Sequence, residues 1–560
     1  MAQPTAQPRR ASLVVAASMV LFTVAVAAFG CASADIVSPD DGAALDSDGS
    51  LPPQPCTTTT VCDGQTVRAC SQGVPGTVVQ ICDDTQACSA GRCTTLSCAA
   101  AERGQSLAGC LIYGALVDNT DRDDALSSLV IVVNPGNTDT DAQLLVRDDT
   151  GQWNNIETVH VPALGAGRFD VPSQHVEGVG VGQALAFRLQ SDQPLTAMLI
   201  ESDDRTEMSQ STGGTMLLPS QALGNEYMVM TYPQRLLPEL SATAGSHDGA
   251  GEITVIGTVD GTNVTVHLSS TASLAAGGGL SAAGPGGSVA VMLDDGDVLQ
   301  LHSEDEGTDL SGSEVLSDNP VVVLSGNIFT SYGRSGPGIN SPDLALEAMW
   351  PVRSWTESYV AARLGPQKDT CDSIFGGASS LWRILAARDD THVTFDAPLG
   401  LAGGLPAGEL VLAQGEVREI LVTSAGSFVI HGSKPILATQ GMDCEGTLSA
   451  AVPVDTLWHD YRFALPANFD HELMVVRHDP MPVLLDGVPI AESLFQPAGG
   501  IFEAARVAIP PCVGLPSNCL HDLTGTFGLT LRGMDVLCGY ALTPFIGSHC
   551  GPVAGPDCIP

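Results

Sequence analysis

The sequence contains very little positive charge. Only two of its 560 residues are lysines, Lys368 and Lys434. Lysine and arginine together number 23 against 63 aspartates and glutamates, which gives a formal net charge of −40. Nucleic-acid binding needs clustered lysines and arginines that neutralise phosphates. The composition therefore argues against a nucleic-acid partner and indicates an acidic surface that favours solubility.

Motifs for catalysis are also missing. HELMV at His471 lacks the second histidine of the HExxH zinc motif, and GxSxG does not occur. The glycine-rich stretch at 275–287 is not followed by the Lys-Ser/Thr of a phosphate-binding loop. The twelve histidines are scattered singly, as is typical of surface or packed residues. We predict no catalytic residue, no cofactor and no metal site.

One acidic segment has the residue types of a calcium-binding loop. It is DNTDRDD, which contains Asp118, Asp121, Asp123 and Asp124. Carboxylate oxygens suit calcium, but the glycine and the terminal glutamate of an EF-hand loop are absent. We interpret the segment as a solvated loop.

Long apolar runs are absent after the N-terminus. The first such run, Leu13 to Phe29, follows Arg9 and Arg10 and ends just before Cys31. A basic segment, an apolar segment and small residues at the cleavage site are typical of an export signal, and the cysteine resembles the lipidated residue of bacterial lipoproteins. Residues 1–30 are thus predicted to be a lipoprotein signal peptide, with Cys31 as the membrane anchor. An uncleaved signal anchor and ordinary secretory cleavage are the alternatives. The lipoprotein interpretation places the protein in the cell envelope, anchored in the outer membrane and exposed at the surface or in the periplasm.

A tether and a cysteine-rich module follow the predicted anchor. Residues 31–55 are rich in Asp, Ser, Gly and Pro and cannot form a core. The module at 56–98 is too short for a large core, and an exported segment of this kind is typically held by disulfides. Zinc is disfavoured because the cluster has no CxxC pair and no histidine. Its disulfide candidates are Cys56, Cys62, Cys70, Cys82, Cys88, Cys93, Cys98 and Cys110, the last of which could instead belong to the following strand.

The later cysteines suggest pairs by proximity alone. Cys512 and Cys519 are separated by a short loop. Cys538 is close to both Cys550 and Cys558, and the sequence leaves this choice open.

The rest of the chain, 99–560, carries a repeated stretch that is clearest at Val315–Gly326, VLSDNPVVVLSG. Two apolar runs of β-branched residues flank a polar turn, which predicts a β-hairpin whose second strand begins at proline. The copies are Ala186–Leu199, Phe428–Thr439 and Leu529–Tyr540, with Pro194, Pro320, Pro435 and Asp535 at matching positions.

Three shorter motifs also recur in this region. A proline eight residues before a tyrosine occurs at Pro219–Tyr227, Pro351–Tyr359 and Pro453–Tyr461, with CLIYGALV as a diverged first copy. Alternating strands around an acidic turn, predicted to pair with each other, occur at Glu252–Leu268 and Trp382–Ala397. DLSGS at Asp309–Ser313 is matched by DLTGT at Asp522–Thr526, each just before a closing hairpin.

The repeats predict an all-β fold of four units with about seven strands each. One arrangement is a propeller-like body in which half-units form seven blades. The other is a row of tandem β-sandwiches. The absence of linkers between units favours a single closed body.

These shared motifs resemble the IgGFc-binding protein N-terminal domain family over roughly Cys110 to Phe545. The resemblance implies an exported surface protein that binds through its surface. The motifs are structural turns and carry over no Fc-binding property. We therefore expect a binding or adhesion module for a protein or glycan ligand. A structural envelope lipoprotein and a hydrolase whose residues gather only in three dimensions remain as alternatives.

Segments outside the repeated motifs are expected to carry recognition. These segments are Asp118–Asp124, His247–Gly251, Tyr332–Ile339 and Gly365–Gly377. Aromatic side chains concentrate binding energy, so Tyr332 and Phe375 are the predicted ligand contacts.

Overall fold

The described residues confirm the all-β prediction. The computed structural model describes residues 60–544 apart from 72–73, 105, 120–127, 149, 202–210, 235–248, 331–342, 366–379, 399–403, 423–425, 442–446, 468, 479 and 535–538. This part of the chain forms 36 strands and a single α-helix, α1 (Leu96–Gly104). None of its helices has the length and apolarity that crossing a membrane requires. The predicted signal peptide, Cys31 and the tether lie outside the described residues.

Disulfides connect the short strands of the N-terminal module. Cys62 bonds to Cys88 and Cys82 bonds to Cys93. Cys98 of α1 bonds to Cys110 in the first strand of the body, and Cys70 is also in a disulfide. The strands form one three-stranded and one two-stranded sheet. They are β1 (Thr60–Asp63), β2 (Thr66–Ser71), β3 (Val74–Ile81), β4 (Gln86–Ser89) and β5 (Arg92–Thr95).

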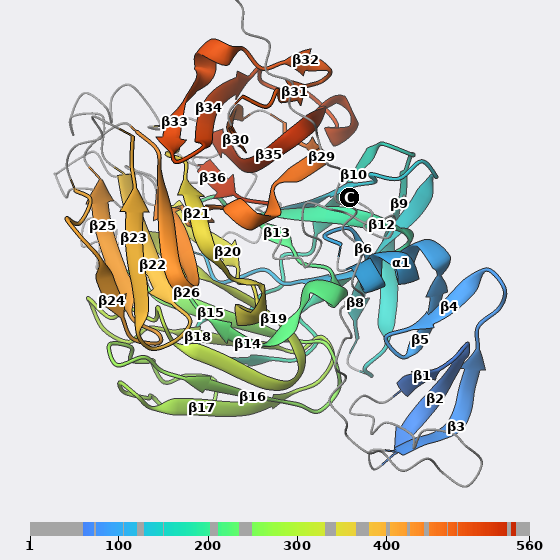
Figure 1. The fold of residues 1–560 in the computed structure, drawn as a ribbon. Helices are drawn as coiled ribbons and strands as arrows, with labels where there is room; N and C mark the ends of the chain where they lie inside the picture. Colours follow the sequence, from blue (N-terminus) through green and yellow to red (C-terminus); the bar gives the residue numbers. More distant parts are fainter. Residues whose placement is uncertain are drawn as a thin grey trace, which may run out of the picture. The chain divides into compact units, whose positions relative to one another are not determined.

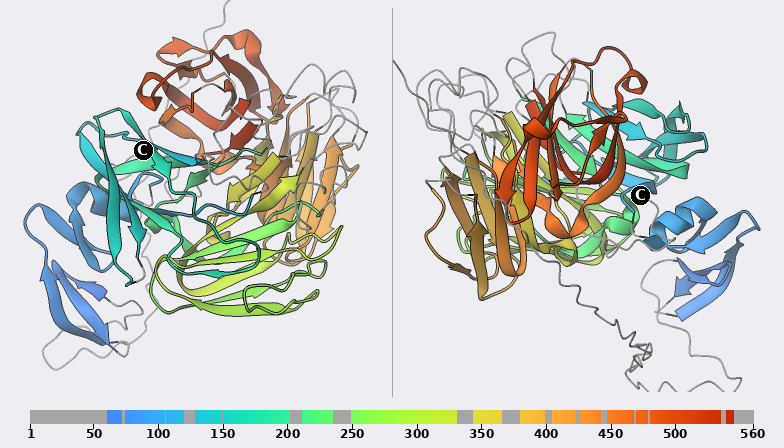
Figure 2. Two further views of the ribbon diagram at one scale, coloured as in Figure 1. Left: turned by 180° about the vertical axis from the view of Figure 1, so that it is seen from behind. Right: turned by 45° about the horizontal axis from the view of Figure 1, so that its top comes forward.

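Four larger curled sheets follow, and each sheet with its connections is called a repeat (Figures 1 and 2). The seven strands of repeat one are β6 (Gly109–Gly114), β7 (Ser128–Val133), β8 (Thr140–Arg147), β9 (Trp153–Val161), β10 (Ala166–Val171), β12 (Phe187–Glu201) and β13 (Gly213–Leu217). The eight strands of repeat two are β11 (Gly180–Gly182), β14 (Gly224–Met228), β15 (Gly251–Gly257), β16 (Thr262–His267), β17 (Ser288–Leu293), β18 (Val298–His302), β19 (Glu314–Thr330) and β20 (Asp343–Ala348).

Repeats three and four also have eight strands each. Repeat three contains β21 (Thr356–Ala361), β22 (Ser380–Ala386), β23 (Thr391–Asp396), β24 (Leu410–Leu412), β25 (Val417–Val422), β26 (Phe428–Gly441), β27 (Ser449–Ala450) and β28 (Val452–Pro453). Repeat four contains β29 (Trp458–Ala464), β30 (Asp470–His478), β31 (Leu484–Leu485), β32 (Val488–Pro489), β33 (Phe495–Gly499), β34 (Phe502–Ile509), β35 (Leu520–Met534) and β36 (Gly539–Leu542).

The stretch predicted as a hairpin is one long strand. VLSDNPVVVLSG lies within β19, whose first half pairs with β14 and β16 and whose second half pairs with β15 and β20. The hairpin prediction is therefore wrong. The polar SDNP segment does not reverse the chain but interrupts the ladder, so that the strand passes from one layer of its sheet to the other. The long strands β12 and β26 change neighbours in the same way.

The acidic turns are corners and not hairpin turns. β15 and β16 flank the turn at Asp260, yet they pair with β19 and not with each other. β22 and β23 likewise both pair with β26. The predicted pairing of these strands is wrong because alternation reports a buried face and not the neighbouring strand. The body thus contains four sheets, each with a long strand shared by two groups of neighbouring strands, and not seven separate blades.

The fourth copy of the repeated stretch lies earlier than predicted. The long strand of repeat four is β35, and DLTGT is inside it, so DLTGT is not the equivalent of DLSGS. At the interruption of β12, β19 and β26, the register advances by five residues on the long strand and by two on the neighbouring strand. In β35 it advances by only three residues, from Thr524 to Phe527, against two on the neighbouring strand. Gly525 in this shorter interruption has φ +122°, which residues with side chains rarely adopt. Asp535 therefore does not match Pro194, Pro320 and Pro435.

The repeated tyrosines stabilise the longer interruptions. The Tyr227 hydroxyl donates to the Val321 carbonyl (2.6 Å) and accepts from the Gly224 N–H (2.7 Å). The Tyr359 hydroxyl donates to the Ile436 carbonyl (2.8 Å), the equivalent position in β26. Tyr461 faces the short interruption of β35, and its hydroxyl has no hydrogen-bond partner among the described residues. In repeat one, register places Ile112 at this position, so Tyr113 is not the equivalent residue.

We expect Tyr227→Phe to lower the free energy of unfolding by about 1–3 kcal/mol, because two buried backbone groups lose their partner. The matched control is Tyr461→Phe, which removes the same atom where it has no hydrogen-bond partner in the described part of the chain, and which should cost less than about 1 kcal/mol. Urea unfolding of both variants provides the measurement. Equal losses in the two variants would contradict the role assigned to Tyr227.

The apolar cores connect the repeats in a closed series. One cluster contains residues of repeats one, two and three, and a second joins repeats three and four. A third packs Leu129, Ile131 and Ile200 of repeat one against repeat four. Because β7 thereby contributes to both core faces, all six of its residues are buried. All described residues belong to one compact unit, Pro55–Pro560.

Candidate functional site

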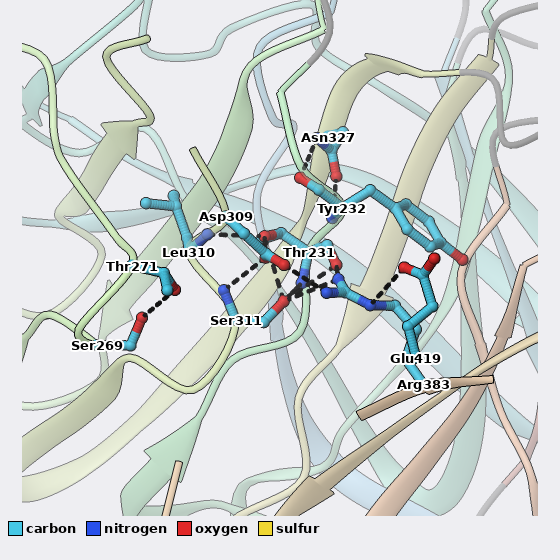
Figure 3. A network of polar contacts seen from close by, with 10 residues as sticks. All are labelled: Thr231, Tyr232, Ser269, Thr271, Asp309, Leu310, Ser311, Asn327, Arg383 and Glu419. Atoms are coloured by element: carbon cyan, nitrogen blue, oxygen red, sulfur yellow. Dashed lines mark hydrogen bonds and ion pairs between the residues drawn. The ribbon is translucent and has the colours of Figure 1, made fainter. Parts of the chain in front are cut away.

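The DLSGS motif forms a polar contact between repeats two and three. Arg383 of β22 contacts Asp309 and the Thr231 carbonyl, and it donates to Ser311 Oγ at 3.1 Å (Figure 3). The Arg383 side chain is only 4% exposed. Oε2 of Glu419, a partly exposed residue, lies 3.8 Å from Arg383 Nε. The centre of the Tyr232 ring lies 5.7 Å from Arg383 Cζ. We call these residues the Arg383 cluster: Thr231, Tyr232, Asp309, Ser311, Arg383 and Glu419.

Electrostatics within the Arg383 cluster favour the ion pair. Burial would raise the pKa of Asp309, but the charge and hydrogen bonds of Arg383 outweigh it, so the pKa lies below its ordinary value. Asp309 also accepts from Thr231 Oγ1 and from the Ser311 N–H, both at 3.0 Å. All contacts of the cluster are made within the protein, although Arg383 Nε has no hydrogen-bond partner among the described residues. We interpret the cluster as structural.

A second polar cluster lies between repeats one and two. Asp118 follows β6; its Oδ2 accepts from the Gly178 N–H (2.9 Å) and lies 3.7 Å from Nε2 of His302 in β18. His175 Nε2 lies 3.4 Å from Glu177 Oε1. One ligand atom from each of Asp118, His175 and Glu177 falls within 4.8 Å of the others, the one such group of three found among the described residues.

Gln300 of β18 holds the segment that carries His175 and Glu177. Its Nε2 donates to the carbonyls of Val176 (2.9 Å) and Gly178 (3.0 Å). Its Oε1 accepts from the Asp118 N–H at 3.2 Å. One buried amide therefore fixes both chain segments of the cluster.

Two buried carboxyl groups lie behind these residues. Glu201, at the end of β12, accepts from the Val117 N–H at 3.0 Å. Burial, with a smaller contribution from the charge of Asp118, raises the pKa of Glu201 to about 8. Glu252 of β15 is directly opposite His302 in the sheet and is fully buried. Burial and the charges of Asp118 and Glu201 raise the pKa of Glu252 well above its ordinary value, and neither of its carboxylate oxygens has a hydrogen-bond partner among the described residues.

A hollow of about 560 Å³ opens beside this cluster. His175 and Glu177 lie on its wall, together with Arg147, Gln174 and Gln183. The wall is mostly polar, and Glu177 is 79% exposed. The hollow gives solvent access to His175 and Glu177, two of the three grouped residues. We call Asp118, His175, Glu177, Glu201, Glu252 and His302 the Asp118 cluster.

The structure describes only some of the residues predicted from sequence. Cys512 bonds to Cys519. Asp118 is not part of a solvated loop, since its side chain is 17% exposed and hydrogen-bonded; burial beneath the 176–178 segment is the reason. The predicted residues outside the described part of the chain are Cys31, Cys56, Asp121, Asp123, Asp124, Tyr332, Phe375, Cys538, Cys550 and Cys558.

Sequence reasoning missed most of the Asp118 cluster. Glu201, Glu252 and His302 each lie in or at the end of an apolar strand, where a charged or polar side chain is unusual. Gln300 and His302 are two positions apart and so share one face of β18. Polar residues within apolar strands indicate a buried polar site, but the local sequence does not show that residues from different strands contact each other.

Comparison with known proteins identifies the repeats. The family model described as IgGFc binding protein matches residues 213–533, from the start of β13 into β35. The human IgGFc-binding protein is 31% identical over 203 residues, which is 35% of this chain and 3% of the human protein. The family match covers β13 of repeat one and continues through repeats two and three into repeat four, whereas Asp118, His175 and Glu177 lie before it.

Proposed function

Because the chain belongs to the IgGFc-binding protein family, we propose that it is a surface-displayed binding module for a protein ligand. One observation supports the proposal most strongly: the side chains of the motifs shared with the family already make contacts within the protein. Tyr227 and Tyr359 stabilise strand interruptions, and Asp309 pairs with Arg383 between repeats. Recognition is then left to side chains outside these motifs, on a scaffold held by buried contacts.

Display on the cell surface rests on the sequence before the body. The Arg9–Cys31 segment supports export and lipidation, and the tether and disulfide-rich module extend the body from the membrane. In a Cys31→Ser variant the chain should leave the membrane fraction and appear in a soluble or precursor form. Normal processing with retention in the detergent phase would contradict lipid anchoring.

The binding proposal is tested with the purified mature chain immobilised on a sensor. The human relative is named for the Fc part of immunoglobulin G, so Fc is the first probe, followed by serum and extracellular-matrix protein mixtures. We expect saturable capture of a protein, weakened about tenfold or more when Tyr332 and Phe375 are both alanine. The matched control, Met481→Ala with Val488→Ala, removes exposed apolar side chains of repeat four.

Two results would overturn the proposal. Absence of any captured protein would favour the structural envelope lipoprotein. Turnover of a peptide or glycan panel would favour a hydrolase. Capture that is equally reduced in the control variant would remove Tyr332 and Phe375 from the binding surface.

A further inference from the structure

The Asp118 cluster has the donors and the access of a metal centre. We propose that Asp118, His175 and Glu177 bind one divalent transition-metal ion between repeats one and two. Their ligand atoms lie within 4.8 Å of one another, close enough for a single ion to contact all three. The three residues precede the family match at 213–533, so the proposed site is independent of the binding function above.

Neighbouring groups hold the Asp118 carboxylate and the backbone that carries the other two ligands. The Gly178 N–H orients the Asp118 carboxylate. Gln300 fixes the carbonyls on both sides of Glu177, and the residue before Val176 is His175. Hydrogen bonds from outer-shell groups to the ligand residues are a regular feature of protein metal sites, because they reduce the conformational entropy lost when the metal binds.

Glu252 provides a second observation at the Asp118 cluster. Both of its carboxylate oxygens are buried without a hydrogen-bond partner among the described residues. A buried polar group in that state is costly. It lies opposite His302, whose Nε2 is 3.7 Å from Asp118 Oδ2, and it interacts with the charges of Asp118 and Glu201. A cation bound at Asp118 would interact favourably with the ionised forms of Glu201 and Glu252.

The donor set selects the class of ion. Calcium and magnesium prefer oxygen ligands throughout, whereas zinc and manganese accept imidazole together with carboxylates. One histidine with one aspartate and one glutamate therefore points to the transition-metal class. His175 and Glu177 line the hollow of about 560 Å³, from which water or a ligand group could complete the coordination shell.

The test uses the purified mature chain with free thiols alkylated beforehand, so that cysteines cannot bind zinc. Equilibrium dialysis against zinc chloride should give one zinc per chain, and a tenfold excess of calcium should not displace it. His175→Ala and Glu177→Gln should each weaken binding by about tenfold or more. Zinc should also raise the melting temperature of the wild type but not of either variant.

His160→Ala is the matched control. His160 also lies near two carboxylates, 3.7 Å from Asp139 and 2.9 Å from Asp141, but its side chain is 61% exposed on repeat one. It should leave zinc binding unchanged. The proposal is overturned if the wild type takes up no zinc, if His175→Ala and Glu177→Gln bind like the wild type, or if His160→Ala causes the same loss. Because Glu177 is 79% exposed, its substitution should fold normally even if His175→Ala does not.

Discussion

Replacing Arg383 by alanine is expected to lower the free energy of unfolding by about 3–5 kcal/mol, because it leaves a buried carboxylate without its counter-charge. The Arg383 side chain is 4% exposed and that of Asp309 is 16% exposed. Water therefore replaces the lost guanidinium poorly. The Thr231 carbonyl, which also accepts from Arg383, loses a partner at the same time.

A surface pair between the same two repeats serves as the control. Arg388 of repeat three lies 2.9 Å from Glu226 of repeat two, and both side chains are at least 40% exposed. Exposed pairs contribute little, so Arg388→Ala should cost less than about 1 kcal/mol. Chemical denaturation at pH 7 compares the two variants. Similar small losses in both would show that the Arg383 cluster does not hold repeats two and three together.

The effect of Arg383→Ala should also depend on pH. The folded-state pKa of Asp309 is lowered, so its contribution to stability is fully present above its unfolded pKa of about 4. That contribution is lost as pH falls through the lower folded-state pKa. The difference between wild type and variant should accordingly shrink in acid.

Glu347→Gln is expected to remove a decline of stability with rising pH. Glu347 of β20 is buried, and its Oε2 has no hydrogen-bond partner among the described residues. Burial raises the pKa of Glu347 well above its ordinary 4.5, against a smaller opposite effect of the Ala450 N–H. The folded state therefore keeps a proton that the unfolded chain releases above about pH 4.5.

The sign of this effect follows from proton binding. Above the unfolded pKa the folded chain binds more protons, so its stability falls by about 1.4 kcal/mol per pH unit until the folded-state pKa is reached. Urea titrations at pH 5, 6 and 7 should give a flatter profile for Glu347→Gln than for the wild type. Glu357→Gln, at the exposed position of β21, is the control and should keep the wild-type slope. An unchanged slope in Glu347→Gln would mean that this carboxyl is ionised in the folded protein.

Sequence reasoning was effective where structure depends on local pattern. Alternation at Val264, Val266 and Leu268 correctly indicated a strand with one buried face. The Pro-to-Tyr spacing correctly placed a strand at each tyrosine, although Tyr227, Tyr359 and Tyr461 are the fourth residues of β14, β21 and β29 and not their starts. The closely spaced Cys512 and Cys519 form the predicted disulfide.

The failures concern which segments contact each other. SDNP in β19 was interpreted as a reversal because a polar break between apolar runs has the same local signature in a hairpin and in a bent strand. DLTGT was equated with DLSGS by its letters, although Asp522 pairs with Arg462 inside the sheet of repeat four. Neither distinction can be made without the neighbouring strands.

The Asp118 cluster was inaccessible for the same reason. Asp118, His175 and His302 are far apart in the chain and lie in two different repeats. Only the packing of repeat one on repeat two brings them together. The unusual residue was Glu252, a charged side chain in a strand that is otherwise suited to a core.

The central claim is that the four repeats form one interlocked scaffold, and amide hydrogen exchange tests it most directly. The N–H groups of Thr212 in repeat one and Gly539 in repeat four both donate to the buried Asp343 carboxylate of repeat two. If the repeats separate only on global unfolding, both amides should exchange as slowly as those at the centres of β15 and β30. Fast exchange of these two amides, with the strand centres still protected, would show that the repeats come apart independently and would contradict the account.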